Sequence, residues 1–289
     1  MIRRHAGNDY LLITQNDHAI LAGQLAAHFG NRRFAAPDPR EQTLAGATFH
    51  DCGWPVHDDL PTLNPKGQPI DVFESTIALA VKVWSASASR AAAHGDYAGL
   101  LVSLHVLNLS GFAGARELTR REQFELNQFQ QGEFERQENY RKRLGLRTDL
   151  PLRFGLADPG ADPSEDQLAF NYRVIQATDQ ISLGLCCTEP PFKQIKNLHA
   201  ATGSPPITLT LERSGPTTLE VDPWPFDVRE LSFKIPYRRI SAQTFATLAD
   251  FQQAWDASAT EQLALEVHGR QNQTMGAGGI EPPARQPAD

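Results

Sequence analysis

A carboxylate on the apolar face of a long predicted helix constrains this chain more than any other feature. The segment from Asp162-Pro163 to about Cys187 has the signals of one helix, because a capping aspartate precedes a first-turn proline. Asp179 lies on a stripe of this helix whose other members are Leu168, Tyr172, Ile175, Ser182 and Leu183. A bare buried charge is very costly, so the fold must give Asp179 a partner or a metal ion.

Three histidines also fall on apolar faces of predicted helices. His18 shares a face with Leu21, Ala22 and Leu25 on a helix that we expect to start at Asn16 or Asp17 and to end at Gly30. His105 shares a stripe with leucines on a helix that follows Asp96. His50 and Asp51 follow an apolar stretch on a helix marked by Asp38-Pro39. We expect these side chains to converge with Asp179.

Histidines and carboxylates from separate helices of a bundle can point inward onto one ion. Such ligands suit a divalent transition metal, namely iron, manganese or zinc. Each residue also has a plainer interpretation, and these alternatives stay open. The histidines can be core residues without any metal, Asp51 can cap the turn at Gly53, and Asp179 can pair with Arg173.

The hydrophobic pattern predicts a mainly α protein. Further helices are expected at about 71–93, after Asp96 and within 116–144. Later segments alternate polar and apolar residues or are rich in β-formers, and they predict short strands at 207–213, 218–224, 231–240 and 262–269. We therefore expect a helical domain at 1–190, a β-rich subdomain with a small antiparallel sheet at 191–270, and a disordered tail at 271–289.

Composition argues against two classes of partner and indicates a cellular compartment. The net charge is −7 and there is no basic tract, which argues against nucleic-acid or anionic-membrane binding. Three cysteines without a CxxC pair are not a disulfide framework, so a reducing compartment is expected. The first apolar run, Tyr10–Ile13, is too short for a signal peptide or a membrane span. We expect a cytoplasmic protein.

The order His18, His50-Asp51, Asp179 resembles the H…HD…D signature of the HD superfamily of all-α, metal-dependent phosphohydrolases. The chain is more closely similar to an uncharacterised bacterial family of unknown function with HD-like character, over the segments 15–30, 50–69 and 100–109. The resemblance covers about residues 10–190 and implies an HD-like helical bundle.

The resemblance also implies roles for particular residues. The metal ligands would be His18, His50, Asp51 and Asp179, and His105 would be an additional histidine that contacts a metal or a phosphate. Two-metal HD proteins have further intervening histidines. His57 in a loop and His94 at a helix end lack the context for that role.

Two functions follow as hypotheses. The first is a hydrolase that attacks a small, phosphorylated molecule or nucleotide with a metal-activated water, in which Asp51, His105 and Asp58 are the expected catalytic residues. The mouth of its pocket would be shaped by Asp58, Gln15 and Trp54. The second is a non-catalytic protein that binds a metal or ligand for structure or sensing, which predicts a closed metal site.

Overall fold

The computed structural model describes residues 1–270, and the predicted tail at 271–289 lies outside them. In this part of the chain the helices are α1 (Gln15–Ala27), α2 (Arg40–Phe49), α3 (Pro55–Asp58), α4 (Ile77–Ala91), α5 (Asp96–Gly114), α6 (Arg120–Leu144), α7 (Pro163–Cys186) and α8 (Leu248–Ala257), with short 3₁₀ helices at Val72–Glu74 and Ala92–His94. The strands are β1 (Ile2–Ala6), β2 (Asp9–Ile13), β3 (Leu152–Arg153), β4 (Leu156–Ala157), β5 (Gln194–His199), β6 (Pro206–Gly215), β7 (Thr218–Asp222), β8 (Glu230–Ser241) and β9 (Thr260–Gly269).

The expectation of a mainly α, or all-α, chain built on an HD-like bundle is wrong. Seven strands form one sheet in the order β1-β2-β8-β9-β7-β6-β5, and β3 pairs with β4 in a second, two-stranded sheet. The large sheet is mixed rather than antiparallel, because β7 and β9 run parallel. It also includes the N-terminal hairpin β1-β2, whose second strand pairs with β8. The sheet therefore contains strands from both ends of the described chain. The predicted division into two domains near residue 190 stays a prediction.

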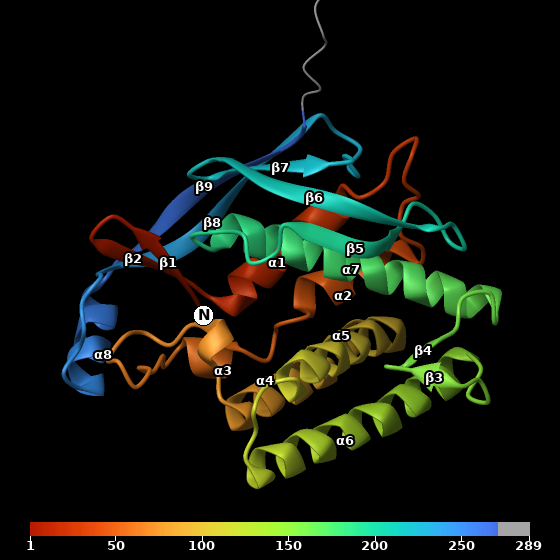
Figure 1. The fold of residues 1–289 in the computed structure, drawn as a ribbon, viewed down its shortest axis with the longest axis horizontal. Coiled ribbons are helices and arrows are strands. Elements are labelled where there is room, and N and C mark those ends of the chain that lie inside the picture. The colour runs from red at the N-terminus through yellow and green to blue at the C-terminus, as the bar shows by residue number, and fades with distance from the viewer. Residues whose placement is uncertain (271–289) are drawn as a thin grey trace, which may run out of the picture.

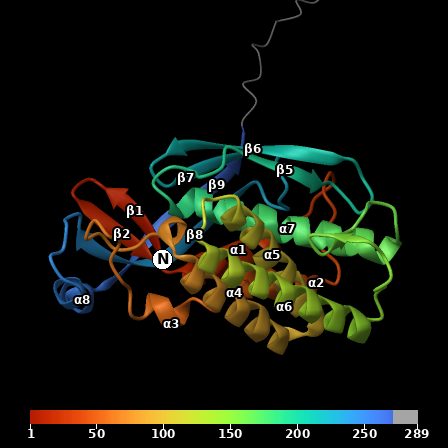
Figure 2. The same ribbon diagram turned by 60° about the horizontal axis from the view of Figure 1, so that its bottom comes forward.

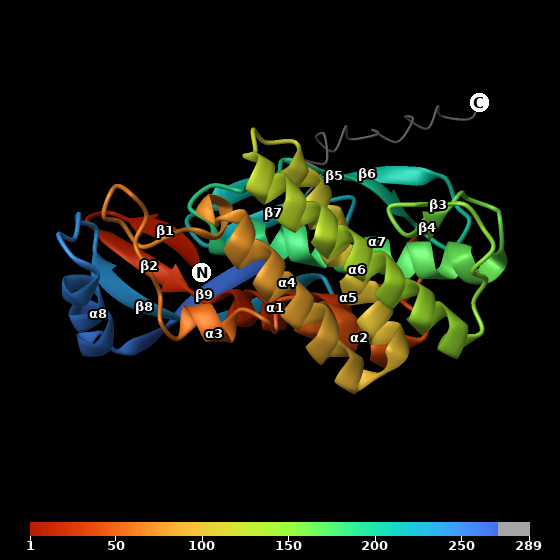
Figure 3. The ribbon, with the colours of Figure 1, turned by 90° about the horizontal axis from the view of Figure 1, so that it is seen from below.

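The helices stack below this sheet in layers (Figure 1). Helices α1 and α7 pack directly against the strands, and α2 and α5 pack on the other side of these two helices. Helices α4 and α6 cover α5 on the side away from the sheet, as the views in Figures 2 and 3 show. The short helix α8 packs at one end, against β8.

Helix α7 is buried on two sides because it lies between the sheet and the other helices. Phe170, Val174 and Ile181 pack into the core that α7 shares with the strands. Leu168, Tyr172 and Ile175 pack into a second core, with residues of α2 and α5. The stripe predicted for Asp179 is thus confirmed for Leu168, Tyr172 and Ile175, whereas Leu183 packs in the core that α7 shares with the strands. The helix has two apolar sides, and the large sheet covers the second.

Local signals explain where the helices begin. Asp162 caps α7 by accepting a hydrogen bond from the Ser164 backbone nitrogen at 2.9 Å, as predicted. Helix α1 starts slightly earlier than predicted. Its cap is Thr14, whose hydroxyl accepts from the Asp17 backbone nitrogen at 3.0 Å.

Helix α5 is long and apolar enough to cross a membrane by length and composition alone. However, 72% of its most apolar 18-residue window is buried inside the fold. Its position between α2, α4, α6 and α7 explains this composition, because a helix that is covered all round is apolar all round.

The turn that carries His50 and Asp51 is held against α4 by a close backbone approach at Gly53. The Gly53 nitrogen donates a hydrogen bond to the Ser87 hydroxyl at 2.9 Å. A Cβ at this glycine would lie 2.0 Å from the Val83 carbonyl oxygen, which is a backbone atom of α4. Only glycine fits this contact without a shift of the turn or of the helix.

We therefore predict that Gly53→Ala lowers the free energy of unfolding by about 1–3 kcal/mol, the usual cost of overpacking. Gly132→Ala on the exposed face of α6 is the matched control, because a Cβ there meets no atom within 4 Å. It should leave stability unchanged or raise it by about 0.5–1 kcal/mol. Chemical denaturation measures both values, and equal effects of the two substitutions would contradict this account of Gly53.

Candidate metal centre

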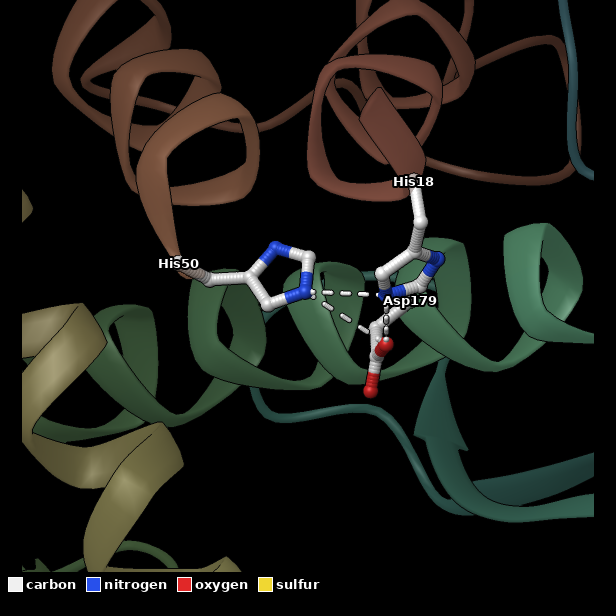
Figure 4. Close-up of side chains that lie close together, drawn as sticks. All are labelled: His18, His50 and Asp179. Carbon is white, nitrogen blue, oxygen red and sulfur yellow. Dashed lines mark hydrogen bonds and ion pairs between the residues drawn. The ribbon is translucent and has the colours of Figure 1, made fainter. Parts of the chain in front are cut away.

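Five buried polar residues from four helical segments meet between α7 and the helices packed on it. His18 lies in α1, His105 lies in α5 and Asp179 lies in α7. His50 is the C-cap of α2, and Asp51 follows it. Each is less than 10% exposed. Figure 4 shows that His18, His50 and Asp179 point toward one another.

The ligand atoms of these residues have the spacing of atoms that share a metal ion. The Nε2 atoms of His18 and His50 lie 3.3 Å apart. Oδ1 of Asp179 lies 3.0 Å from the first nitrogen and 3.5 Å from the second. Bonds of about 2.1 Å at ordinary coordination angles place neighbouring ligand atoms roughly 3.0–3.4 Å apart. The three atoms can therefore bind one ion with little movement.

Asp51 lies at the edge of this group. Its Oδ2 is 3.6 Å from Nε2 of His50 and 3.9 Å from Nε2 of His18. Its other oxygen, Oδ1, accepts a hydrogen bond from the Trp54 indole nitrogen at 3.2 Å. This bond leaves Oδ2 directed at the two histidines, so Asp51 is placed as a fourth ligand.

The second nitrogen of each imidazole is held by an acceptor. Nδ1 of His50 lies 2.7 Å from the Ala47 carbonyl oxygen, which can only accept, so this nitrogen carries a proton. Nδ1 of His18 lies 2.7 Å from the Ser182 hydroxyl, which itself donates to the Asp179 carbonyl oxygen at 2.8 Å. The hydrogen-bond network thus assigns a proton to Nδ1 of both rings, as in metal sites where a neighbouring acceptor fixes the tautomer.

This assignment directs four acceptors at one point. In the neutral rings both Nε2 atoms carry lone pairs, and they face the carboxylates of Asp51 and Asp179. Lone pairs that face each other in a buried site repel unless a cation lies between them. That cation is a metal ion or a proton, and the donor set of imidazole and carboxylate suits iron, manganese or zinc.

Without a metal, protons must balance the cluster. Burial lowers the pKa of His50, but Asp51 and Asp179 outweigh this effect and the net result is a pKa of about 9. Burial raises the pKa of Asp179, but its hydrogen bonds to His18 and His50 hold it well below its usual range. Burial also raises the pKa of Asp51. A metal ion that enters near neutral pH therefore displaces a proton from His50.

His105 differs from the other two histidines. Burial lowers its pKa to about 4, so the ring is neutral at neutral pH. Its Nε2 lies 4.0 Å from Oδ2 of Asp179, and its buried Nδ1 has no partner among the described residues. His105 is therefore beside the three closest ligands rather than among them, with a free nitrogen.

A cavity of about 260 Å³ opens beside the cluster. Its polar lining consists of the site residues His18, Asp51, His105 and Asp179, together with Gln15, Ser75 and Arg116. The rest of its lining is apolar or aromatic: Trp54, Val72, Phe73, Ile77, Ala80, Trp84, Leu109, Phe112, Ala113 and Leu183. The cluster is thus open to a small molecule on one side.

The structure brings together five of the six predicted site residues, namely His18, His50, Asp51, His105 and Asp179. Gln15 and Trp54 line the cavity, but both are buried, so they lie in its interior rather than at the mouth where they were expected. Asp58 does not line it. Its carboxylate accepts from the Gln15 backbone nitrogen at 2.7 Å and lies 3.0 Å from the Met1 nitrogen, so it anchors the start of α1.

Sequence reasoning missed Arg116, Phe73, Phe112 and the orienting role of Ser182. A signal existed for Ser182, because it shares the stripe of Asp179 one helical turn later. No comparable signal marked the cavity wall. Its residues come from α4, the end of α5 and the 3₁₀ helix at Val72–Glu74, and only the packing of these elements brings them together.

Comparison with known proteins agrees with part of the expected relationship. No curated protein and no solved structure matches the chain. The model of a family described as "Protein of unknown function (DUF3891)" matches residues 1–242. This confirms the expected similarity to an uncharacterised family, while membership of the HD superfamily stays a prediction. The chain belongs to the DUF3891 family, whose function is unknown.

Proposed function

We propose that this protein is a metal-dependent hydrolase of a small phosphoester. The observation that carries the proposal is the convergence of two imidazole nitrogens and the Asp179 carboxylate at the spacing of metal ligands, with the Asp51 carboxylate beside them and an open cavity next to the cluster. The order of these residues along the chain resembles the H…HD…D signature, and this analogy supports the choice of a phosphoester as substrate.

In this proposal His18, His50 and Asp179 hold the ion, and Asp51 completes the set. When bound, an iron, manganese or zinc ion lowers the pKa of a coordinated water and polarises a substrate oxygen. Asp51 and His105 both line the cavity, so both can reach a water or a substrate beside the ion.

His105 is suited to move a proton during the reaction. It lines the cavity beside the proposed metal ligands, its Nδ1 has no partner among residues 1–270, and burial favours its neutral form. A water molecule attacks phosphorus, the bond from phosphorus to the leaving oxygen breaks, and the proton lost by the water ends on the leaving group. A neutral imidazole can accept this proton and then return it.

The non-catalytic alternative is less well supported. A structural or sensing site would hold its metal in a closed ligand shell. The cavity leaves one side of this cluster open, which favours catalysis on a small molecule. A cytoplasmic location, without a nucleic-acid or membrane partner, belongs to the same proposal.

The first prediction concerns metal content. The purified or reconstituted protein should contain about one iron, manganese or zinc ion per chain, and His18→Ala and Asp179→Ala should lose it, because each removes a ligand. His28→Ala is the matched control, since His28 is partly exposed and pairs with Asp227 away from the cluster. Elemental analysis with circular dichroism tests this. An empty parent protein, or equal content in all variants, would contradict the proposal.

The second prediction concerns pH. The pKa of His50 without metal is raised from 6.5 to about 9, so its proton stabilises the metal-free fold below pH 6.5, and this contribution is lost as the pH rises toward 9. A metal ion competes with that proton, so metal-dependent stabilisation increases over the same window. In the presence of a chelator, the melting temperature should therefore fall as the pH rises from 6.5 to 9. The increase in melting temperature caused by added metal should grow over the same range. If the increase in melting temperature caused by metal became smaller as the pH rose, the metal ion would not compete with the His50 proton.

The third prediction separates chemistry from metal binding. His105→Gln should retain the ion, because His105 lies outside the closest ligand group, but kcat should fall by about 10²–10⁴-fold. Release of p-nitrophenolate from a chromogenic phosphoester measures this, with metal content determined on the same samples.

Since two histidines and one carboxylate also bind iron in oxygenases, the iron form should be assayed for oxygen uptake. Oxygen consumption without ester hydrolysis would overturn the hydrolase proposal.

A further inference from the structure

The residues that line the cavity indicate which class of substrate it can bind, and the metal ligands alone do not. Two indole rings, Trp54 and Trp84, and the aliphatic side chains of Ile77 and Leu109 line its interior. These four residues come from the turn after α2, from α4 and from α5. A surface of this kind releases water favourably when it contacts an apolar group, by about 25 cal/mol for each Å² buried.

The volume of the cavity sets the size of that group. A dry cavity of roughly 150 Å³ with a lining of Leu, Ile and Phe accommodates benzene. The cavity beside the cluster measures about 260 Å³, so it has room for one ring together with an ester group. A larger polycyclic group would have to extend through the mouth.

The mouth of the cavity is apolar as well. Phe112 is 70% exposed and Phe73 is 51% exposed, and both line the cavity. Large aromatic side chains with this much exposure at the entrance of a cavity are typical of a binding surface. The apolar wall therefore continues from the buried cluster to the solvent.

The charges around the cavity limit the charge of the substrate. Asp51 and Asp179 contribute two negative charges, which one divalent ion balances. Among residues 1–270, Arg116 is the one Lys or Arg that lines the cavity, and its side chain is exposed to solvent. A phosphate with two negative charges would thus enter a site in which the described residues provide no buried Lys or Arg to pair with it.

A buried donor offers a contact for a single charged oxygen. Gln15 is 2% exposed and lines the cavity, and its side-chain nitrogen Nε2 has no partner among the described residues. Its backbone nitrogen is held by Asp58, so the start of α1 positions the side chain. An unpaired buried amide nitrogen is costly unless a ligand or water accepts its hydrogen bond.

From these observations we propose that the substrate is a phosphoester with one negative charge and one aromatic or branched alkyl group that fills the cavity lined by Trp54 and Trp84. This inference rests on the proposed hydrolase function and narrows it. Water replaces the leaving oxygen on phosphorus, the apolar group stays in the cavity, and the leaving group takes the proton. Nucleoside triphosphates and other polyanions do not fit the charge of this site.

The test is a series of chromogenic esters that share one leaving group, assayed with the metal-loaded, full-length protein. p-Nitrophenyl phenylphosphonate carries one charge and a ring, and p-nitrophenyl methylphosphonate carries one charge without a ring. p-Nitrophenyl phosphate carries two charges. The phenyl compound should exceed the methyl compound in kcat/KM by about 10–100-fold, as burial of a ring predicts, and both should exceed the dianion.

Two variants locate the preference in the cavity. Ala80→Leu narrows the interior, and Phe112→Ala removes a ring from the mouth, so each should reduce the phenyl-to-methyl ratio at least about threefold. Phe124→Ala is the matched control, because Phe124 is 64% exposed on α6 and does not line this cavity. Calorimetric titration with monoethyl phenylphosphonate and monoethyl methylphosphonate gives a second readout, with tighter binding expected for the phenyl ester.

The outcomes separate the two proposals. A metal-loaded protein that hydrolyses none of the esters contradicts the hydrolase function itself. Hydrolysis with equal rates for phenyl and methyl esters, or with a preference for the dianion, leaves the hydrolase intact and overturns the substrate class. A phenyl preference that neither cavity variant alters also overturns it, because the ring then binds elsewhere.

Discussion

The repulsion among four buried acceptors is the constraint on which the arrangement of this protein depends. His18, His50, Asp51 and Asp179 come from three helical segments, and the hydrogen bonds of Ala47 and Ser182 direct both free imidazole nitrogens inward. Such a group is costly to bury without a cation. In the proposed metal-bound state, an ion would offset this cost and connect α1, α2 and α7, so metal binding would be coupled to folding.

The large sheet makes that burial possible. It covers one side of α7 and of α1, while α2 and α5 cover the other side of α7. The cluster lies on the helix-facing side, where α4 and the end of α5 also enclose the cavity. Since one end of the cavity is charged and the rest is apolar, a metal-activated reaction and selection of an apolar substrate group can occur side by side.

Much of the site was predictable from sequence, because buried polar residues on apolar helix faces are rare and informative. His18, His105 and Asp179 were identified in this way, and the adjacent His50-Asp51 completed the pattern. Asp58 was expected among the catalytic residues, but its carboxylate anchors the start of α1 instead. Proximity along the chain did not indicate which way that side chain points.

The sheet was the main error, and its cause is physical. β1 has the sequence IRRHA and β5 the sequence QIKNLH, and both contain charged residues where a half-buried strand needs few. In β1, Arg4 is buried only because its guanidinium donates to backbone carbonyls at the end of α7, including Leu185 at 2.6 Å. Contacts between residues so distant in sequence leave no periodic signal. Hence the sequence predicted most of the helices and the strands β6, β7, β8 and β9, but not β1, β5 or the joining of seven strands into one mixed sheet.

The most direct test of the account is anomalous X-ray diffraction from crystals of the metal-loaded protein, measured at the absorption edge of the bound element. The account predicts one strong peak at about 2.0–2.3 Å from Nε2 of His18, Nε2 of His50 and a carboxylate oxygen of Asp179, with Asp51 turned toward it. No peak at this point, with His18 and Asp179 still in direct contact at about the present 3.0 Å, would show that protons alone hold the cluster together.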